Sequence, residues 1–502
     1  MVNIIEQYQL KVNETNVNIK IIKDSDNSLI YTLDLPKFQK PTLAFIDEIK
    51  NTLISEISLT SREILDPKVS DNIKDRFKQK AKTLLEEYMP GLPESTKTYL
   101  INYLLNESLG LGKIEYFLQD RFLEEVIINS ADEPIRVYHK RHGWLLSNVI
   151  IENEEQIINY SNIIARKVGK QITILNPLLD AHIITGDRAN AVLYPISNKG
   201  STITLRKFSK DPITMTDMIT SNVISSEALA LIWLSLEYEM NMIISGGTAS
   251  GKTSFLNVCM PFIPPNHRII SIEDTRELYL PKYLYWCPLV TRLPNPEGEG
   301  GVGMLDLLIN ALRMRPDRVI LGEIRKSEDA RVLFEAMHTG HSVYSTVHAD
   351  SANETVKRLV NPPIEVPENL LEAVHLNVVM FRDRRKNIRR TYQISEFILS
   401  EHEGKIKPNL IYRWKPAEDK VVKYSPSLRL FEQLSRHTGL SQTEIDKDIQ
   451  DKDDILKFLI KKNIRNVHEV GKVMKEYYLN KDNVSKIVKK NLDIKKLLLK
   501  ND

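Results

Sequence analysis

The sequence predicts an α/β protein in which a parallel sheet wrapped by helices follows a separate α+β region. Helix and strand patterns alternate from residue 227 to residue 346, which is typical of parallel strands joined by crossover helices. Before residue 208 the strand-like runs are short, and 124–138 reads as paired strands around an Asn-Ser-Ala-Asp turn. At 502 residues the chain is long enough for two or three domains.

Residues 1–105 are predicted to form an N-terminal extension in which strands precede helices. Strand-like runs at 17–22 and 29–35 alternate with Asp-rich turns. Apolar residues then recur every three or four positions from 41 to 118, with an interruption at the Pro-Gly-Leu-Pro stretch 90–93.

Residues 106–208 are predicted to form an α+β domain of their own. A helical pattern covers 155–168, and strand patterns cover 191–194 and 202–205. The polar stretch Ser-Lys-Asp-Pro at 209–212 interrupts the strands and predicts the boundary with the next domain.

Residues 209–400 are predicted to form the α/β domain, and 401–502 a C-terminal subdomain with a helical tail. Past Asp451 the tail is helical in pattern, and its basic residues outnumber the acidic ones, which is typical of a solvated helical face. The predicted elements of the α/β domain are helix 227–238, strand 242–244, a helix from Lys252, strand 268–272, helix 305–315, strand 318–321, helix 327–338 and strand 342–346.

The charge balance and the cysteine content exclude several classes of protein. Basic residues number 69 and acidic residues 66, so the formal net charge is +3. A protein that coats nucleic acid needs a strong basic excess, so no nucleic-acid partner is expected. The two cysteines, Cys259 and Cys287, cannot form a disulfide framework or a cysteine-rich zinc site, which favours a reducing compartment.

A cytoplasmic location is expected from the apolar patterns. The start of the chain carries Glu6 and no basic cluster, so it does not resemble a secretory signal. The most apolar long stretch, 228–244, is interrupted by Glu237 and Glu239, whereas a bilayer-spanning helix needs about 20 nearly uncharged residues.

The strongest motif follows the strand pattern at 242–244 and opens the next helix. It matches GxxxxGK[ST], a loop whose backbone N–H groups surround phosphate oxygens at the positive end of a helix. Lys252 would reach the β- and γ-phosphates, and Thr253 would give its hydroxyl to Mg²⁺. The predicted nucleotide-binding residues are Gly246, Gly247, Thr248, Ala249, Ser250, Gly251, Lys252, Thr253 and Ser254.

Two carboxylates follow apolar strands and would complete a site for ATP hydrolysis. Glu323 ends the strand 319–321 as the carboxylate of a Walker B segment, with Gly322 where an aspartate is commoner. Because strand ends of a parallel sheet face the ligand crevice, Glu323 should emerge beside the metal. Glu273, after the strand 268–272, can supply the missing carboxylate, so Thr253, Glu323 and Glu273 are the predicted metal-binding residues. Which of the two glutamates is the general base stays open.

Two histidines and two arginines are candidate catalytic residues. His341 and His348 bracket the strand pattern 342–346, and an imidazole there can sense the γ-phosphate through a hydrogen bond. A structural role for each histidine is the alternative. Arg188 and Arg206 precede the domain boundary and, in a ring of subunits, could reach a neighbour's γ-phosphate. A surface ion pair is the alternative for both arginines.

These motifs, in this order, resemble those of the type II/type IV secretion ATPase superfamily, over roughly residues 110–397. The matching segments are 245–253 for the Walker A loop, 271–277 for the Asp box, 312–325 for the arginine-rich lead and Walker B, and 339–349 for the His box. Upstream, 177–180 and 186–190 look like the family's second N-terminal domain, with Arg188 and Arg206 at its arginine-finger positions.

The resemblance implies a hexameric motor that uses ATP and Mg²⁺. It implies a RecA-like ATPase domain at 209–400, moving against the N-terminal domain, and a polytopic membrane platform protein as partner at the cytoplasmic face. Such a motor drives filament assembly from pilin-like subunits, or secretion. An archaeal type IV pilus assembly ATPase is favoured, with residues 1–105 contacting the platform.

Three other functions are the alternatives. The archaellum motor belongs to the same superfamily, and a RecA-like nucleic-acid translocase would share the ATPase ring. A scaffold that only switches conformation with ATP would have no need of Glu323.

Overall fold

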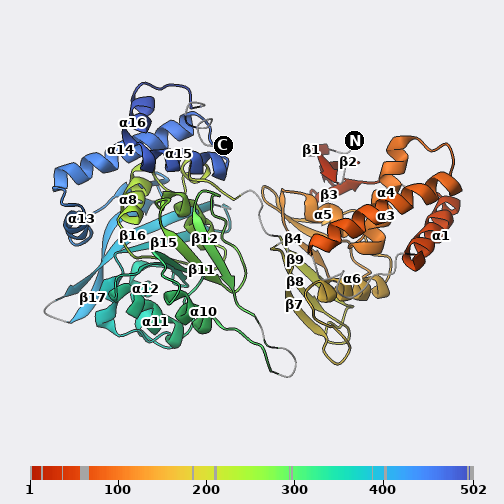
Figure 1. The fold of residues 1–502 in the computed structure, drawn as a ribbon, viewed down its shortest axis with the longest axis horizontal. Helices are drawn as coiled ribbons and strands as arrows, with labels where there is room; N and C mark the ends of the chain where they lie inside the picture. The colour runs from red at the N-terminus through yellow and green to blue at the C-terminus, as the bar shows by residue number, and fades with distance from the viewer. Residues whose placement is uncertain are drawn as a thin grey trace. The chain divides into compact units, whose positions relative to one another are not determined.

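The computed structural model describes residues 3–494 and Leu497, apart from 13–14, 37, 57–66, 184–185, 208–211, 293, 295–297, 387 and 401–403. The chain divides into two compact units, Met1–Lys210 and Asp211–Asp502 (Figure 1). The boundary predicted at 209–212 lies, except for Pro212, outside the described residues. None of the described helices is long and apolar enough to cross a membrane.

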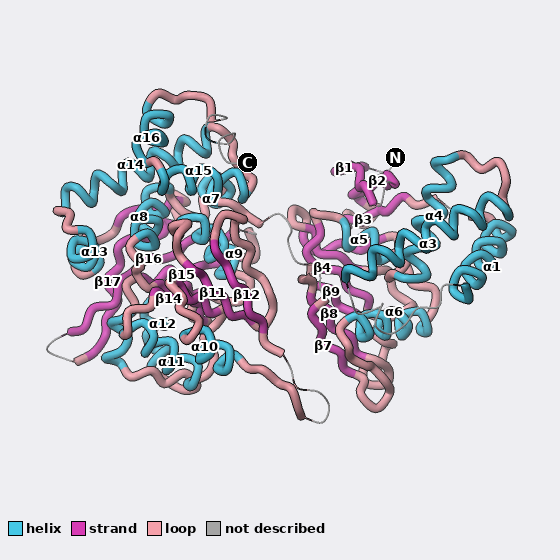
Figure 2. Tube along the Cα trace, viewed as in Figure 1, coloured by secondary structure: helices cyan, strands magenta, loops and turns pink. Residues whose placement is uncertain are grey.

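The first unit is built on one twisted sheet (Figures 1 and 2). Its strands are β1 (Asn3–Val12), β2 (Thr15–Lys23), β3 (Leu29–Asp34), β4 (Leu123–Ile128), β5 (Arg136–His139), β6 (Gly143–Ser147), β7 (Leu178–His182), β8 (Arg188–Val192) and β9 (Thr202–Arg206). These described strands pair in the order β1-β2-β3-β6-β5-β4-β9-β8-β7. Its helices are α1 (Lys40–Glu56), α3 (Pro67–Tyr88), α4 (Glu94–Leu109), α5 (Ile114–Gln119) and α6 (Glu154–Lys167).

Apolar side chains alternate along these strands, so one face of the sheet is buried beneath helices. Helix α5 contacts β1 and β4, and α6 contacts β7 and β9. Helices α1, α3 and α4 pack on one another around a small core of their own, which includes Ile49, Leu53, Phe77 and Leu104.

The separation predicted between 1–105 and 106–208 is wrong for the strands. β3 pairs in parallel with β6, with Ile30 opposite Leu146. The buried Tyr31 donates its hydroxyl to the carboxylate of Asp120 at 2.7 Å, so the two segments also share a core. Strand pairing and a shared core between residues far apart in sequence thus join two segments that the local sequence patterns had divided.

The second unit contains the parallel sheet. Its strands are β10 (Met242–Gly246), β11 (Arg268–Glu273), β12 (Tyr285–Val290), β13 (Arg318–Leu321), β14 (Ser342–Val347), β15 (Leu376–Asp383), β16 (Ile388–Ser400), β17 (Lys405–Lys415) and β18 (Lys420–Lys423). They pair in the order β12-β11-β13-β14-β10-β15-β16-β17-β18 among the described residues. The pairs from β12 to β15 are parallel, and those from β15 to β18 are antiparallel.

Helices cover both faces of this sheet, as expected for parallel strands buried on both sides (Figure 2). The helical elements are α7 (Met215–Thr220), α8 (Ser226–Glu237), α9 (Lys252–Cys259), η1 (Met260–Phe262), α10 (Met304–Leu312), α11 (Ser327–His338), α12 (Ala352–Val360), η2 (Glu368–Ala373), α13 (Leu430–Thr438), α14 (Gln442–Lys461), α15 (Val467–Leu479) and α16 (Lys481–Lys489). One core contains residues of α8, α9 and the C-terminal helices, and another contains residues of α10, α11 and α12.

The domain end predicted at residue 400 is wrong. β16 runs to Ser400 and pairs antiparallel with β17, where Ile394 lies opposite Tyr412. The sheet therefore continues through β18, because these hairpin strands complete the hydrogen bonding of β15.

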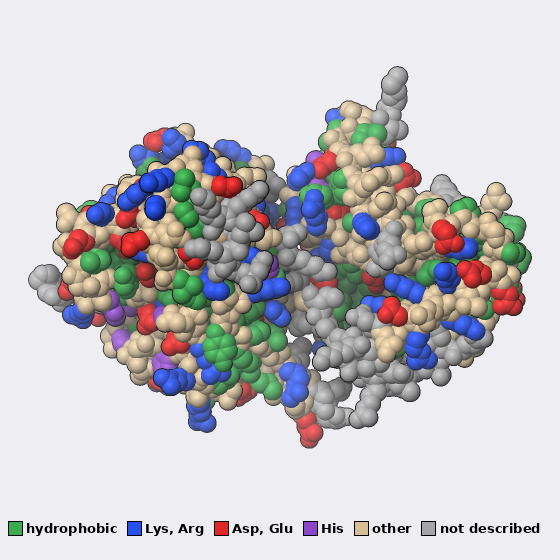
Figure 3. All heavy atoms as spheres, turned by 45° about the horizontal axis from the view of Figure 1, so that its top comes forward, with side chains coloured by type: hydrophobic (Ala, Val, Ile, Leu, Met, Phe, Trp, Pro, Cys, Tyr) green, Lys and Arg blue, Asp and Glu red, His purple; other side chains and the backbone are tan. Residues whose placement is uncertain are grey.

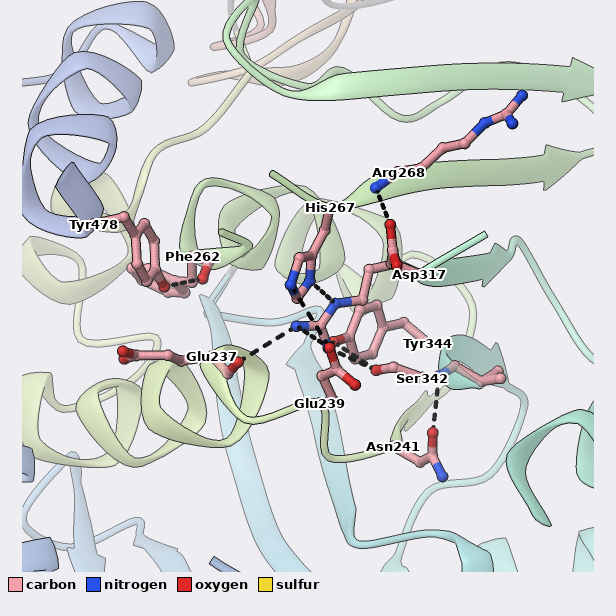
Figure 4. Close-up of polar contacts among 12 residues, drawn as sticks. Glu237, Glu239, Asn241, Phe262, His267, Arg268, Asp317, Ser342, Tyr344 and Tyr478 are labelled. Carbon is pink, nitrogen blue, oxygen red and sulfur yellow. Dashed lines mark hydrogen bonds and ion pairs between the residues drawn. The ribbon is translucent and has the colours of Figure 1, made fainter. Parts of the chain in front are cut away.

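A buried arginine closes the sheet at the edge where the parallel strands begin. Arg318, the first residue of β13, is fully buried and donates to His267 Nδ1 at 3.1 Å. It also donates to the hydroxyls of Ser342 at 2.8 Å and Tyr344 at 2.6 Å. Figure 4 shows that His267, Ser342, Tyr344 and Glu239 lie close together. Burial and the Arg318 guanidinium lower the pKa of His267, which keeps the imidazole neutral so that it can accept this hydrogen bond.

The interpretation of the tail past Asp451 as a mere solvated face is also wrong. Lysine and arginine side chains do lie on the surface over the C-terminal helices (Figure 3). Lys452 on α14, however, is fully buried, with its ammonium 2.7 Å from Asp448 and 3.0 Å from Glu237 of α8. The hydroxyl of Tyr477 on α15 accepts a further hydrogen bond from it at 2.9 Å. The tail is therefore part of the core beneath α8.

Lys452→Ala should destabilise the second unit by about 3 kcal/mol, because it removes the buried cation that Glu237 and Asp448 share. Asp448 keeps one other cation, Lys481 at 2.6 Å, whereas Glu237 loses its ion pair with the buried lysine. Lys447→Ala, at an exposed position of the same helix, should change the unfolding free energy by less than about 0.5 kcal/mol. Urea unfolding followed by circular dichroism measures both. Equal effects of the two substitutions would contradict a structural role for the buried ammonium.

Candidate functional site

The phosphate-loop motif lies between the end of β10 and the start of α9. Gly251 adopts φ +95° as the N-cap of α9, and no side chain caps the helix there. Gly246 adopts φ +151°, and a Cβ on it would lie 2.5 Å from the carbonyl oxygen of Met380. The glycines therefore permit a turn that other residues would strain or block. The N–H groups of the first turn of α9 stay available for an anion.

The side chain of Lys252 is folded back over this loop. Its ammonium donates to the carbonyl oxygens of Gly246 at 2.8 Å and Gly247 at 3.1 Å. Burial lowers the pKa of Lys252, while the carboxylates of Glu323 and Asp350 oppose that shift. Thr253 and Ser254 follow in the first turn of α9 and are partly exposed. The loop residues predicted from the motif thus lie together around one cation.

Glu323 follows the buried strand β13 and faces the same edge of the sheet as the loop. Its Oε2 accepts hydrogen bonds from Arg325, with a shortest separation of 2.6 Å. Arg325 also donates to Asp274 at 2.7 Å, so one guanidinium bridges two carboxylates. The prediction missed the bridge. Asp274 is the neighbour of Glu273 in the same acidic segment, and no local sequence signal shows which of the two carboxylates contacts Arg325.

Glu273 is buried, with 3% of its surface exposed. Its Oε1 accepts hydrogen bonds from the backbone N–H groups of Glu277 at 2.9 Å and Leu278 at 3.0 Å. Burial raises the pKa of Glu273 to about 7, against the opposing effect of these N–H groups. A Cβ on Gly322 would lie 3.5 Å from Glu273 Cγ, so Glu273 fills the space beside the glycine. One of its oxygens already holds the turn after β11.

The two predicted histidines lie at opposite edges of the sheet. His348 follows the end of β14, and its Nε2 is 3.3 Å from the hydroxyl of Thr248 in the loop. Burial and the Lys252 ammonium lower the pKa of His348, which favours the neutral imidazole. His341 precedes β14, and its Nδ1 is 3.3 Å from the hydroxyl of Thr339. Within one chain, His341 therefore does not lie beside the loop as predicted, because the whole length of β14 separates it from the loop.

The two predicted arginines lie in the first unit. Arg188 on β8 and Arg206 on β9 are opposite each other in the antiparallel register, so they share one face of the sheet. Arg188 forms two hydrogen bonds with the carboxylate of Asp180, at 3.0 Å and 2.7 Å. Arg206 lies opposite Glu125 of β4. Each arginine thus has an acidic residue nearby in its own sheet.

Two further residues contact the loop and were not predicted. Arg389 on β16 donates to the carbonyl oxygen of Ala249 at 3.1 Å. Asp350, in the turn before α12, lies beside Gly247. A cavity of about 580 Å³ opens next to the loop and is lined by Thr248, Asp350, Phe381, Arg384, Tyr392 and Trp414, among others. Arg389 comes from a strand and Asp350 from a turn, both remote in sequence from the loop, and no spacing rule connects them with the motif.

Glu273→Gln should remove one pH-dependent contribution to stability. The folded chain keeps this carboxyl protonated up to about pH 7, whereas the unfolded chain ionises it near the ordinary value of 4.5. This stabilisation is therefore complete below pH 4.5 and is lost as the pH rises to about 7. The stability of the wild type relative to Glu273→Gln should fall by about 3 kcal/mol over that range.

Urea unfolding of both proteins across this pH range measures the difference. Glu328→Gln, at an exposed position of α11, should keep the wild-type pH dependence. A stability difference between wild type and Glu273→Gln that stays constant with pH would contradict the protonated state of Glu273.

The chain is similar to several known proteins. A family model described as type II/IV secretion system protein matches residues 185–389. The uncharacterized protein MJ0900 of Methanocaldococcus jannaschii is 35% identical over 397 residues, which are 77% of this chain and 70% of that protein. The type IV secretion system protein VirB11 of Bartonella quintana is 28% identical, over 48% of this chain and 76% of its own length.

Among solved structures, the pilus retraction motor PilT with bound ADP is 16% identical with a TM-score of 0.40, covering 72% of this chain and 95% of that one. The match to the family model spans the phosphate loop and Glu323, and MJ0900 aligns with most of the chain. The chain belongs to the type II/IV secretion system protein family.

Proposed function

We propose that this protein is an ATPase that hydrolyses ATP to ADP and phosphate and uses the reaction for mechanical work. The proposal rests on the loop at 246–253. Lys252 lies over this loop at the start of α9, where no side chain caps the helix, and the negative charge of Glu323 favours the protonated ammonium by opposing the lowering of the Lys252 pKa. A loop that binds anions would suffice for a nucleotide switch. The carboxylate at the end of β13 is the additional group that hydrolysis needs.

The residues present fit a bound nucleoside triphosphate. Lys252 now donates to two backbone carbonyls of its own loop, and phosphate oxygens would take over those hydrogen bonds. The free N–H groups of α9 would surround the phosphates, and Thr253 and Ser254 would add hydroxyls from the first turn. His348 would report the presence of the terminal phosphate through Thr248.

The residues also fit Mg²⁺, which would neutralise charge developing on the phosphates. No group of three or more His, Cys, Asp or Glu side chains suited to a metal occurs in the described part of the chain. Mg²⁺ suits such a site because it keeps several waters and takes few protein oxygens besides the phosphates. Thr253 and Glu323 would hold it, with Glu273 as a third oxygen donor if the backbone N–H groups release that carboxylate.

Glu323 is proposed as the general base. Arg325 holds its Oε2, which leaves Oε1 for the attacking water. Glu273 stays a candidate for the same role, since a buried carboxyl with a pKa of about 7 could exchange a proton near neutral pH.

The mechanical role is proposed from the family. Related proteins carry names from type IV secretion and conjugal transfer. The chain would act as a homo-hexamer at the cytoplasmic face of the membrane, against a polytopic platform protein, with pilin-like subunits moved indirectly. Arg188 and Arg206 would then act on a neighbour's nucleotide, after leaving their present acidic neighbours.

The specific machine is proposed to be an archaeal type IV pilus assembly system, with the archaellum motor as the alternative. The relatives from Methanocaldococcus jannaschii support an archaeal setting. A nucleic-acid translocase is not favoured, because the formal net charge of the chain is only +3.

Lys252→Ala should abolish ATP turnover and weaken nucleotide binding by at least tenfold, because the cation that meets the β- and γ-phosphates is lost. Phosphate release and binding of a fluorescent ATP analogue measure the two effects. Lys326→Ala, an exposed lysine near the same edge of the sheet, is the control and should behave as wild type. Normal ATP turnover in the Lys252→Ala protein would contradict the proposed ATPase site.

Glu323→Gln should bind ATP within about threefold of wild type and lose at least about 100-fold in kcat, since an amide cannot accept the proton of the attacking water. Single-turnover measurements with bound ATP separate this loss from any change in affinity. Glu328→Gln serves as the matched control. If the Glu323→Gln protein hydrolysed ATP at the wild-type rate, Glu323 would not be the general base and another carboxylate would have that role.

A further inference from the structure

We infer that Asp350 is a further catalytic residue, a carboxylate that holds the attacking water at the terminal-phosphate end of the loop. The inference rests on the proposed ATPase function and adds a residue to it. Neither the loop motif nor the Walker B segment contains Asp350.

The fold holds Asp350 in place from its backbone. β14 pairs directly with β10, so the turn that follows β14 lies beside the phosphate loop. The Asp350 N–H donates to Glu354 Oε2 at 3.0 Å, while Ser351 caps α12 by accepting from the N–H of Glu354 at 3.2 Å. These bonds fix the backbone of the residue and leave its carboxylate free to face the loop.

The close approach of Asp350 gives a reason for Gly247. The motif leaves this position open to any residue, and Gly247 does not adopt the left-handed backbone that would require glycine. A Cβ on Gly247, however, would lie 2.9 Å from Asp350 Oδ1, closer than carbon and oxygen normally approach. A side chain at position 247 would therefore displace the Asp350 carboxylate from its place beside the loop.

The charge of Asp350 acts at the end of the loop where the chemistry would occur. Glu323 and Asp350 are, in that order, the carboxylates that act most strongly on the Lys252 ammonium. Because this lysine reaches the β- and γ-phosphates, both carboxylates lie near the terminal phosphate. Glu323 gives one oxygen to Arg325, whereas in the described part of the chain no lysine or arginine forms an ion pair with Asp350.

The Asp350 carboxylate and a bound triphosphate would repel each other, because both are negatively charged. A water molecule between them would reduce this repulsion by donating a hydrogen bond to the carboxylate. The water can donate one O–H group to Asp350 and the other to Glu323, with its lone pair directed at the γ-phosphorus. Attack forms the new oxygen–phosphorus bond, and the bond to the bridging oxygen breaks with its electron pair leaving on ADP. The proton passes to Glu323. Asp350 keeps its charge and orients the water throughout.

Asp350→Asn tests this role in the full-length protein. The amide keeps the shape but accepts more weakly and can donate, so kcat should fall by about 10- to 100-fold. Binding of a fluorescent ATP analogue should stay within about threefold, because Asp350 contacts the water and not the phosphates. Asp383→Asn removes the same charge at the end of β15 and should leave both quantities unchanged.

Gly247→Ala supplies a second, independent test. Its methyl group should collide with Asp350, weakening nucleotide binding by at least tenfold and lowering kcat. In the double variant Gly247→Ala with Asp350→Ala the collision is gone, so binding should recover to within threefold of wild type. Turnover should stay as low as in Asp350→Ala alone. Recovery of binding without turnover is the result that a merely structural Asp350 would not produce.

The outcomes separate the two proposals. Wild-type turnover with an equally active Asp350→Asn protein would overturn the role of Asp350 and leave the ATPase standing. A double variant that binds no better than Gly247→Ala would also overturn it. A wild-type protein that releases no phosphate from ATP with Mg²⁺ would overturn the ATPase and the role of Asp350 together.

Discussion

The close fit of a glycine-rich loop between the ends of two neighbouring strands is the constraint on which this site depends. β10 is buried along its whole length, and its chain must turn sharply at Gly246 to enter α9. On one side the loop lies against the carbonyl of Met380, and on the other against Asp350. A Cβ on Gly246 would collide with the backbone of Met380, whereas a Cβ on Gly247 would displace the Asp350 side chain. The loop conformation is therefore determined by its neighbours as well as by its own glycines.

Charge is organised differently at the two edges of this sheet. Where the parallel strands end, Lys252 and Arg325 lie among the carboxylates of Glu323, Asp274 and Asp350, all partly open to solvent. Where they begin, Arg318 is fully buried and satisfied mainly by neutral acceptors. The charged groups of the first edge are accessible to solvent, whereas the buried arginine of the second edge anchors β13.

The predicted elements agree with the structure where they depend on residues close together in sequence. The loop motif with its flanking strand and helix, and Glu323 at the end of an apolar strand, were placed from local patterns. Predictions that needed tertiary pairing were wrong. The segment 1–105 shares its sheet with 106–208 through β3 and β6, and the tail buries Lys452 against α8. Local hydrophobic periodicity does not contain these partners, because each is more than 100 residues away in the chain.

The sequence alone determined that this chain has an α/β fold, a glycine-rich loop that matches the GxxxxGK[ST] motif, and a strand that ends at a carboxylate. Each depends on a short run of residues whose spacing dictates its local conformation. Only the tertiary structure decided which side chains meet there. It paired Glu323 with Arg325, tied one oxygen of Glu273 to backbone N–H groups, and brought Asp350 against Gly247. It also separated His341 from His348 by the length of β14. The order of strands in a sheet sets these distances, and strand order follows from packing of the whole domain.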